Sequence, residues 1–231
     1  MEKKDPKSII IQTLSVKARL KQQVFDKTFS VFNQAKEVLQ EITNEYNAGL
    51  KGIDKRILLE YKDRGKFEAQ IKIAGDILVF SMHSNIFEFD RGHVVWKTSY
   101  AQKDKTNTYC GIINIYNFLS DSFKYNRNDD LGYLIARVFV NKEMYYFVEG
   151  KRQFGFLYSN FGKEKITREI IKKIINTAIV YALQFDLLVP PYDNVKIASV
   201  GLMNKKIQST QLQTGKRVGF QFNSDDVSGE K

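Results

Sequence analysis

Side chains that could carry chemistry are concentrated between Lys142 and Gly162, in the stretch KEMYYFVEGKRQFGFLYSNFG. It contains seven aromatic residues, the basic pair Lys151–Arg152 and the carboxylate of Glu149. Aromatic rings beside cations can stack on nucleic-acid bases while the cations contact phosphates. A carboxylate close to a lysine can instead bind Mg²⁺ and position a water molecule for hydrolysis. Alternating aromatics are also typical of a buried strand, so three interpretations are open.

The first interpretation is base stacking. After Lys151, a basic residue is followed by an aromatic ring, a glycine and a second ring: Arg152, Phe154, Gly155 and Phe156. This pattern resembles the signature strand of the RNA-recognition fold, although Gln153 and Ser159 depart from it. Alternation along a strand places one set of side chains on the same face: Arg152, Phe154, Phe156 and Tyr158. If that face is exposed, these residues and Lys151 bind nucleic acid; if it is covered, the rings are core.

The second interpretation is metal-dependent hydrolysis. Glu149 and Lys151 follow a hydrophobic strand, and Asp130 lies upstream. This order resembles the aspartate and E-x-K motif of the restriction-endonuclease-like family. The resemblance implies that Asp130 and Glu149 hold Mg²⁺ and that Lys151 positions or activates the attacking water. A two-residue turn between the strands would place Glu149 opposite Leu134, leaving Asp130 about 13 Å away along its strand. That separation weakens the nuclease interpretation.

Few other residues offer catalytic or metal-binding chemistry. The chain has two histidines, His83 and His93, and Asp90 between them could orient one for acid–base work. Turn-flanking histidines are more often plain surface residues. The single cysteine, Cys110, excludes an internal disulfide and is expected to be a packed small residue. We therefore expect no cofactor and, outside the nuclease alternative, no metal site.

The composition predicts a folded, basic protein. Hydrophobic residues make up 43% of the 231 residues, which is enough for a packed core. The formal charge of +10 favours acidic partners such as nucleic acid, but it is spread along the chain without a long block of like charge. No segment approaches the roughly 18 apolar residues of a membrane span, and the N-terminus lacks a signal-peptide core. The expectation is a cytoplasmic protein that does not engage membranes.

A long N-terminal helix is indicated by the first fifty residues. Asp5 and Pro6 form a good helix start, and Gly49 supplies a stop. Four large apolar residues follow one another at intervals of seven: Phe25, Phe32, Leu39 and Tyr46. A helix of this length would either lie across a whole sheet or project in part to pair with a partner. The second possibility makes these four residues candidate oligomer or partner contacts, with a homodimer as one outcome.

The rest of the chain predicts an α+β fold with antiparallel strands. Residues 66–73 alternate apolar and polar side chains, which is typical of a strand with one solvated face. We expect a helix over 109–123, further strands after Leu131, a long helix beginning after Thr167, and a strand over 195–203. The two strand-and-helix segments, 56–125 and 131–203, are roughly alike, which suggests two similar halves.

The expected organisation has four parts. They are a long helix over 1–50, an α+β core over 51–203, a C-terminal hairpin or extension over 204–222, and a disordered tail over 223–231. The function favoured by these observations is an intracellular, non-catalytic binding module associated with nucleic acid. The alternatives are a protein–protein assembly or scaffold subunit that uses the N-terminal helix, and a Mg-dependent nuclease of restriction-endonuclease-like type.

Overall fold

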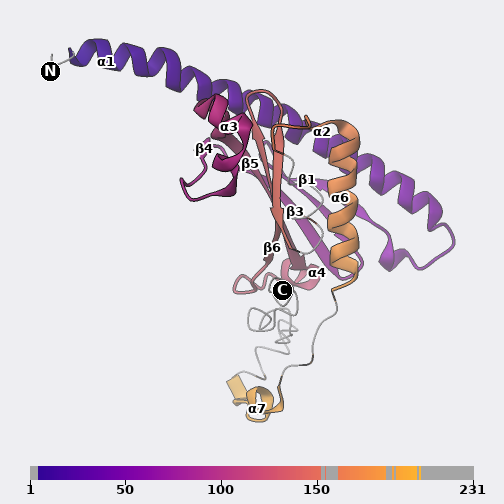
Figure 1. Cartoon of the computed structure of the whole chain (residues 1–231). Helices are drawn as coiled ribbons and strands as arrows, with labels where there is room; N and C mark the ends of the chain where they lie inside the picture. The colour runs from indigo at the N-terminus through magenta and orange to yellow at the C-terminus, as the bar shows by residue number, and fades with distance from the viewer. Residues whose placement is uncertain are drawn as a thin grey trace, which may run out of the picture.

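The computed structural model describes residues 5–151, 154, 161–185, 189, 191–201 and 203. One long helix crosses a twisted antiparallel sheet, and a second helix packs beside it on the same face (Figure 1). The predicted α+β class, with an antiparallel sheet and a long N-terminal helix, is confirmed. Within the part of the chain described here, no helix is both long and apolar enough to cross a membrane.

The N-terminal helix is continuous but contains a π-helical stretch. It consists of α1 (Pro6–Gln12), η1 (Thr13–Ala18) and α2 (Arg19–Gly49). The Asp5 carboxylate accepts a hydrogen bond from the backbone N–H of Lys7, and Pro6 occupies the first turn, as predicted. Residues 5–18, which we call the arm, are all exposed except Ala18, which is half-buried. Figure 1 shows the arm projecting beyond the sheet.

The apolar face of α2 is buried by the chain's own sheet. Phe32 and Leu39 are fully buried, and Phe25 and Tyr46 pack against the same core. The Tyr46 hydroxyl also donates a hydrogen bond to Asn176 Oδ1 at 2.7 Å. The candidate partner contacts are therefore intramolecular, because the sheet provides the apolar surface that this face of the helix needs.

Among the described residues, the strands form a single seven-stranded sheet, in the order β1-β2-β3-β5-β6-β7 with β4 paired to β5. Its strands are β1 (Glu60–Asp63), β2 (Glu68–Ile73), β3 (Asp76–Met82), β4 (Phe87–Glu88), β5 (Tyr109–Leu119), β6 (Tyr133–Asn141) and β7 (Tyr146–Gly150). All pairs are antiparallel. The segments 56–125 and 131–203 thus both contribute strands to one sheet.

The helix predicted over 109–123 is wrong. Residues 109–119 form β5, which lies between β3 and β6 and alternates buried and half-buried side chains along most of its length. Only Ser120–Lys124, the short helix α4, is helical. The apolar residues of this segment satisfy a helical spacing as well as a strand one, and strand pairing on both edges decides the outcome.

The pairing of β5 with β6 contains a β-bulge, and the register between β6 and β7 differs from the predicted one. The pairing of β5 with β6 shifts after Ile115, so Ile135 and Ala136 are both buried on the helix-covered face while Leu134 is exposed. Strict alternation along a strand would place Leu134 and Ala136 on one face, and the bulge puts them on opposite faces. The turn before β7 is also longer than predicted, and Glu149 pairs with Arg137 instead of Leu134.

Helix α6 (Arg168–Leu183) completes the main core. Thr167 caps it by accepting a hydrogen bond from the backbone N–H of Ile170, as expected. Its isoleucines are buried against the sheet, whereas Leu183, its last residue, is exposed. The strand predicted over 195–203 is wrong for the described residues, where the end of α7 (Tyr192–Val195), irregular backbone over 196–199 and helical backbone at 200–201 and 203 occur. The proposed hairpin over 204–222 and the tail over 223–231 lie outside the described residues.

An insertion between β3 and β5 covers one end of the opposite face. It contains η3 (Val94–Lys97), α3 (Ser99–Lys103) and η4 (Lys105–Thr108). Phe139 and Phe147 of the sheet are buried beneath it in a second, smaller core. The Lys142 ammonium lies 2.7 Å from the Asp104 carboxylate, and hydrogen bonds from Lys142 and Thr106 lower the pKa of Asp104 from 3.8 to about 2.

Close packing of α2 on β5 yields a stability prediction. A Cβ added at Gly111 would lie within 2.7 Å of Thr28 Cβ and Cγ2 on α2, closer than real atoms approach. Gly111→Ala should therefore lower the free energy of unfolding by about 1–3 kcal/mol, measured by urea denaturation. Gly75→Ala is the matched control, because a Cβ there meets nothing within 4 Å. Equal stability of the two variants would contradict the close approach of helix and strand.

Candidate nucleic-acid interface

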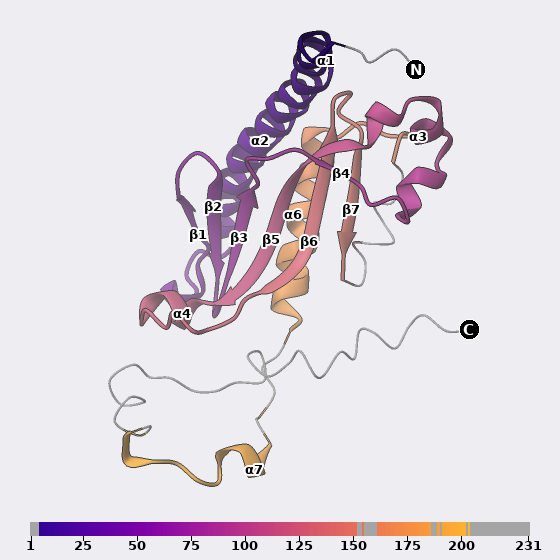
Figure 2. The same ribbon diagram turned by 90° about the vertical axis from the view of Figure 1, so that its left-hand side faces the viewer.

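The sheet has one helix-covered face and one face that the described helices leave largely open. Helices α2 and α6 contact the first face, where Phe80, Ile115 and Ala136 lie in one buried row. Figure 2 shows the sheet from the other side, with both helices behind it and the α3 insertion at one end. We call the side that faces away from α2 and α6 the uncovered face. Alternation assigns Tyr116, on β5, to it.

Three aromatic side chains gather on the uncovered face where β5 ends. The rings of Tyr116 and Phe118 have centroids 6.3 Å apart, and the centroids of Phe118 and Phe123 are 5.4 Å apart. Phe123, which comes from α4, is 37% exposed, and the other two are half-buried. The guanidinium carbon of Arg64 lies 5.5 Å from the centroid of Phe123, within cation–π range. We call Tyr116, Phe118 and Phe123 the aromatic cluster.

A groove of about 290 Å³ adjoins the aromatic cluster. Phe118 and Phe123 line one part of it, and the amides Asn126 and Asn128 line another. Its remaining lining includes an ion pair between Arg127 and Asp130, in which Arg127 Nε lies 3.0 Å from Asp130 Oδ2. Both side chains are almost completely buried. Apolar rings beside amide groups form a surface suited to a flat, hydrogen-bonding ligand.

Polar and charged groups continue along the uncovered face toward the insertion. Asn114 pairs with Ser81 on β3 and with Arg137 on β6. Arg137 forms an ion pair with Glu149, and its side chain is 43% exposed. The face therefore offers rings at one end and hydrogen-bonding and cationic groups nearer its middle.

His93 ties the insertion to the sheet. Its Nδ1 accepts a hydrogen bond from the backbone N–H of Val95, so in the neutral ring the proton is on Nε2, which donates to Glu149 Oε1 at 2.8 Å. The ring also stacks on Phe89, with centroids 4.6 Å apart. Asp90 does not orient this histidine as the sequence suggested; its carboxylate accepts from the backbone N–H of Gly92. Both His93 nitrogens have structural partners, which leaves no free nitrogen for acid–base chemistry in this arrangement.

The predicted stacking strand is placed differently from the expectation. Phe154 is fully buried in the main core, next to Gly150, because the chain turns it inward after β7. Its ring therefore does not face solvent as the stacking hypothesis requires. Arg152, Phe156 and Tyr158 lie outside the described residues. Lys151 is half-buried, and its backbone N–H donates to the carbonyl of Ile135.

The two carboxylates of the nuclease alternative, Asp130 and Glu149, have different partners in the structure. Asp130 pairs with Arg127 before β6 begins, whereas Glu149 pairs with Arg137. The strand from Tyr133 to Arg137 alone spans about 13 Å. Among the described residues, no group of three or more His, Cys, Asp or Glu side chains could hold a metal ion. Both carboxylates instead neutralise neighbouring arginines.

Cys110 is a buried core residue, as the sequence suggested. It packs in the second core, and burial raises the pKa of its thiol. A thiol with a raised pKa stays protonated near neutral pH, so it is a poor nucleophile.

Sequence reasoning missed the aromatic cluster. The helix predicted over 109–123 would not place these rings on an open sheet face, and only the strand alternation of β5 brings Tyr116 and Phe118 to the uncovered face. Comparison of the chain with protein-family models, with curated proteins and with solved structures found no match.

The contrast between Phe154 and Phe123 can be measured. Phe154→Ala should lower the free energy of unfolding by about 3–5 kcal/mol, because it empties a fully buried site. Phe123→Ala should cost about 1 kcal/mol or less, because that ring is partly exposed. Guanidinium denaturation of both variants provides the comparison. A Phe154→Ala protein as stable as Phe123→Ala would show that Phe154 is not a core residue.

Proposed function

We propose that the protein is a non-catalytic binding module that takes single-stranded nucleic acid on the uncovered face of its sheet. The observation that carries this proposal is the aromatic cluster, which lies on the sheet face that α2 and α6 leave open and beside cationic side chains. Aromatic rings on an open sheet are the usual surface for stacking unpaired bases. The proposal includes the cytoplasmic location expected from the sequence.

The charges near the cluster favour a phosphate backbone. Arg64 lies over Phe123, Lys124 adjoins it in sequence, and Arg137 lies on the neighbouring strand. Arg64 and Arg137 are paired with Glu68 and Glu149, so part of their charge is already neutralised. Phosphates would compete with these partly exposed carboxylates, and the net charge of +10 would accelerate the encounter. Affinity should therefore fall as salt increases.

Gel-shift assays with single-stranded DNA and RNA over a salt series test the proposal. Tyr116→Ala and Phe123→Ala should each weaken binding by about 1–3 kcal/mol, because each removes one stacking surface. Tyr192→Ala is the matched control, since Tyr192 is an exposed ring on α7, outside the aromatic cluster. Absence of binding at low salt, or equal effects of all three substitutions, would refute the proposal.

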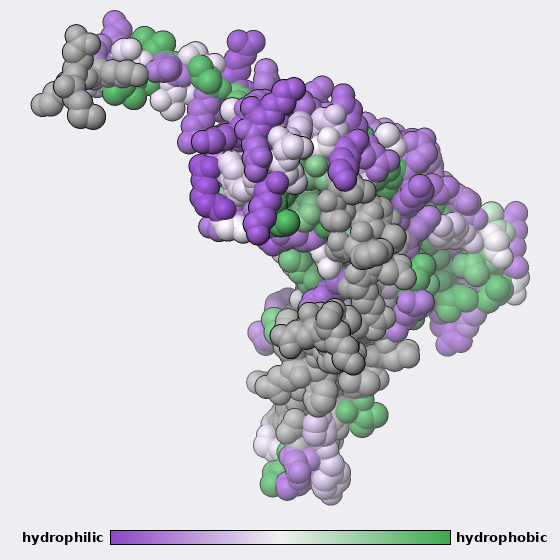
Figure 3. Space-filling model, in the orientation of Figure 1, coloured by the Kyte–Doolittle hydropathy of each residue, from purple (hydrophilic) through white to green (hydrophobic). Residues whose placement is uncertain are grey.

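A second candidate function is self-assembly through the arm. Five large apolar side chains of the arm are between 46% and 62% exposed: Ile9, Ile10, Ile11, Leu14 and Val16. The space-filling view shows apolar atoms along this projecting segment (Figure 3). Three consecutive isoleucines lie on different sides of a helix, and a helix that is apolar on several sides favours burial by a partner. We infer that the arm of a second copy provides this cover.

Light scattering tests the assembly candidate. The full chain should be a dimer, and a chain lacking residues 1–18 should be a monomer, because α2 keeps its intramolecular core from Val24 onward. The double substitution Ile10→Glu and Leu14→Glu should have the same effect without shortening the chain. A full chain that is monomeric at micromolar concentration would exclude this function.

A further inference from the structure

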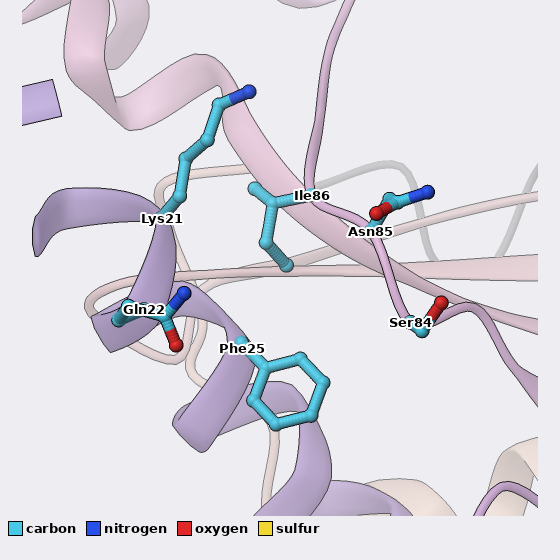
Figure 4. A pocket seen from close by; sticks show the side chains of 6 residues that line it. All are labelled: Lys21, Gln22, Phe25, Ser84, Asn85 and Ile86. Carbon is cyan, nitrogen blue, oxygen red and sulfur yellow. The ribbon is translucent and has the colours of Figure 1, made fainter. Parts of the chain in front are cut away.

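A second groove lies between α2 and the segment that leads from β3 to β4. It has a volume of about 310 Å³, near the lower end of the range of about 300–1,000 Å³ that is usual for ligand sites. Its lining residues come from two short stretches: Lys21, Gln22 and Phe25 on α2, and Ser84, Asn85 and Ile86 opposite them. Figure 4 shows Ile86 pointing toward α2, with the Phe25 ring beside the opening.

The lining combines three kinds of contact. Phe25 offers a half-buried aromatic ring, and Ile86 offers an apolar side chain. The primary amides of Gln22 and Asn85 can both donate and accept hydrogen bonds. Lys21 provides the positive charge, and none of the six lining residues is acidic.

Aromatic rings and lysines continue on both sides of this groove. Phe25 stacks with Phe29 at a centroid distance of 6.0 Å, and both rings meet Phe67 edge to face. The Lys66 ammonium lies 5.2 Å from the centroid of Phe67 and 5.3 Å from that of Phe29. On the other side, the Lys21 ammonium lies 5.8 Å from the centroid of Tyr109. Positive charge therefore lies within the groove, at Lys21, and beside the rings that Phe25 contacts, at Lys66.

We propose that this groove binds one nucleotide, with its base against Phe25, the base edge toward Gln22 and Asn85, and its phosphate toward Lys21. A base has a flat π face and a hydrogen-bonding edge, and the attached phosphate is anionic, which matches the ring, amides and ammonium. The nucleotide can be free or an unpaired residue of a strand. This site does not depend on the aromatic cluster, so it can exist whether or not the uncovered face binds nucleic acid.

Titration with each of the four ribonucleoside monophosphates, followed by ¹⁵N-resolved NMR, tests the site. The side-chain amide signals of Gln22 and Asn85 should shift, and inorganic phosphate alone should shift them much less. Lys21→Glu should weaken binding roughly tenfold or more, because it replaces the cation that meets the phosphate. Lys27→Glu, the same charge change at an exposed position of α2 outside the groove, should change it less than about twofold.

Several outcomes would overturn the proposal. These are absence of shifts at millimolar nucleotide, equal shifts with inorganic phosphate, or equal weakening by Lys21→Glu and Lys27→Glu. Asn85→Ala gives a second test on an exposed residue whose backbone hydrogen bond to His83 Nδ1 the substitution keeps, and it should also weaken binding. Competition by a single-stranded oligonucleotide would identify a strand as the source of the nucleotide, and its absence would identify the free nucleotide. Tyr116→Ala should leave the titration unchanged, which separates this site from the uncovered face.

Discussion

The close packing of α2 against one face of the sheet is the constraint on which the rest of the structure depends. Gly111 lets the helix approach β5 so closely that Thr28 lies against the strand backbone, and the Thr28 hydroxyl is satisfied within the helix by the carbonyl of Val24. Together, α2 and α6 bury the apolar side chains on the helix-covered face of the sheet. The described helices leave the opposite face open except where the insertion covers it, and the half-buried rings of Tyr116 and Phe118 lie on that open part.

Local signals in the sequence predicted much of the helical framework. The cap at Asp5, the seven-residue spacing that includes Phe32 and Leu39, and the cap at Thr167 all describe interactions within one helix or between a helix and a large apolar surface. The alternation over residues 66–73 likewise predicted β2. Each pattern needs only a few neighbouring residues, which is why it could be recognised without knowing the fold.

Features that depend on strand pairing could not be predicted in the same way. The residues of β5 fit a helix or a strand, and the hydrogen bonds to β3 and β6 choose between them. The bulge near Ile135 and the pairing of Glu149 with Arg137 also arise from two strands together. Because of these non-local interactions, the candidate interface seen in the structure contains Tyr116, whereas the one predicted from the sequence contained Phe154. The exposure of a ring depends on which face the helices cover, and no short motif contains that information.

The central claim is that single strands bind to the uncovered face through its aromatic cluster. Ultraviolet cross-linking of the full chain to a single-stranded oligonucleotide, followed by peptide mass spectrometry, tests it most directly. The account predicts cross-links in residues 106–124, which carry Tyr116, Phe118 and Phe123 on β5 and α4. Cross-links found only in α2 or α6, on the helix-covered side of the sheet, would contradict it.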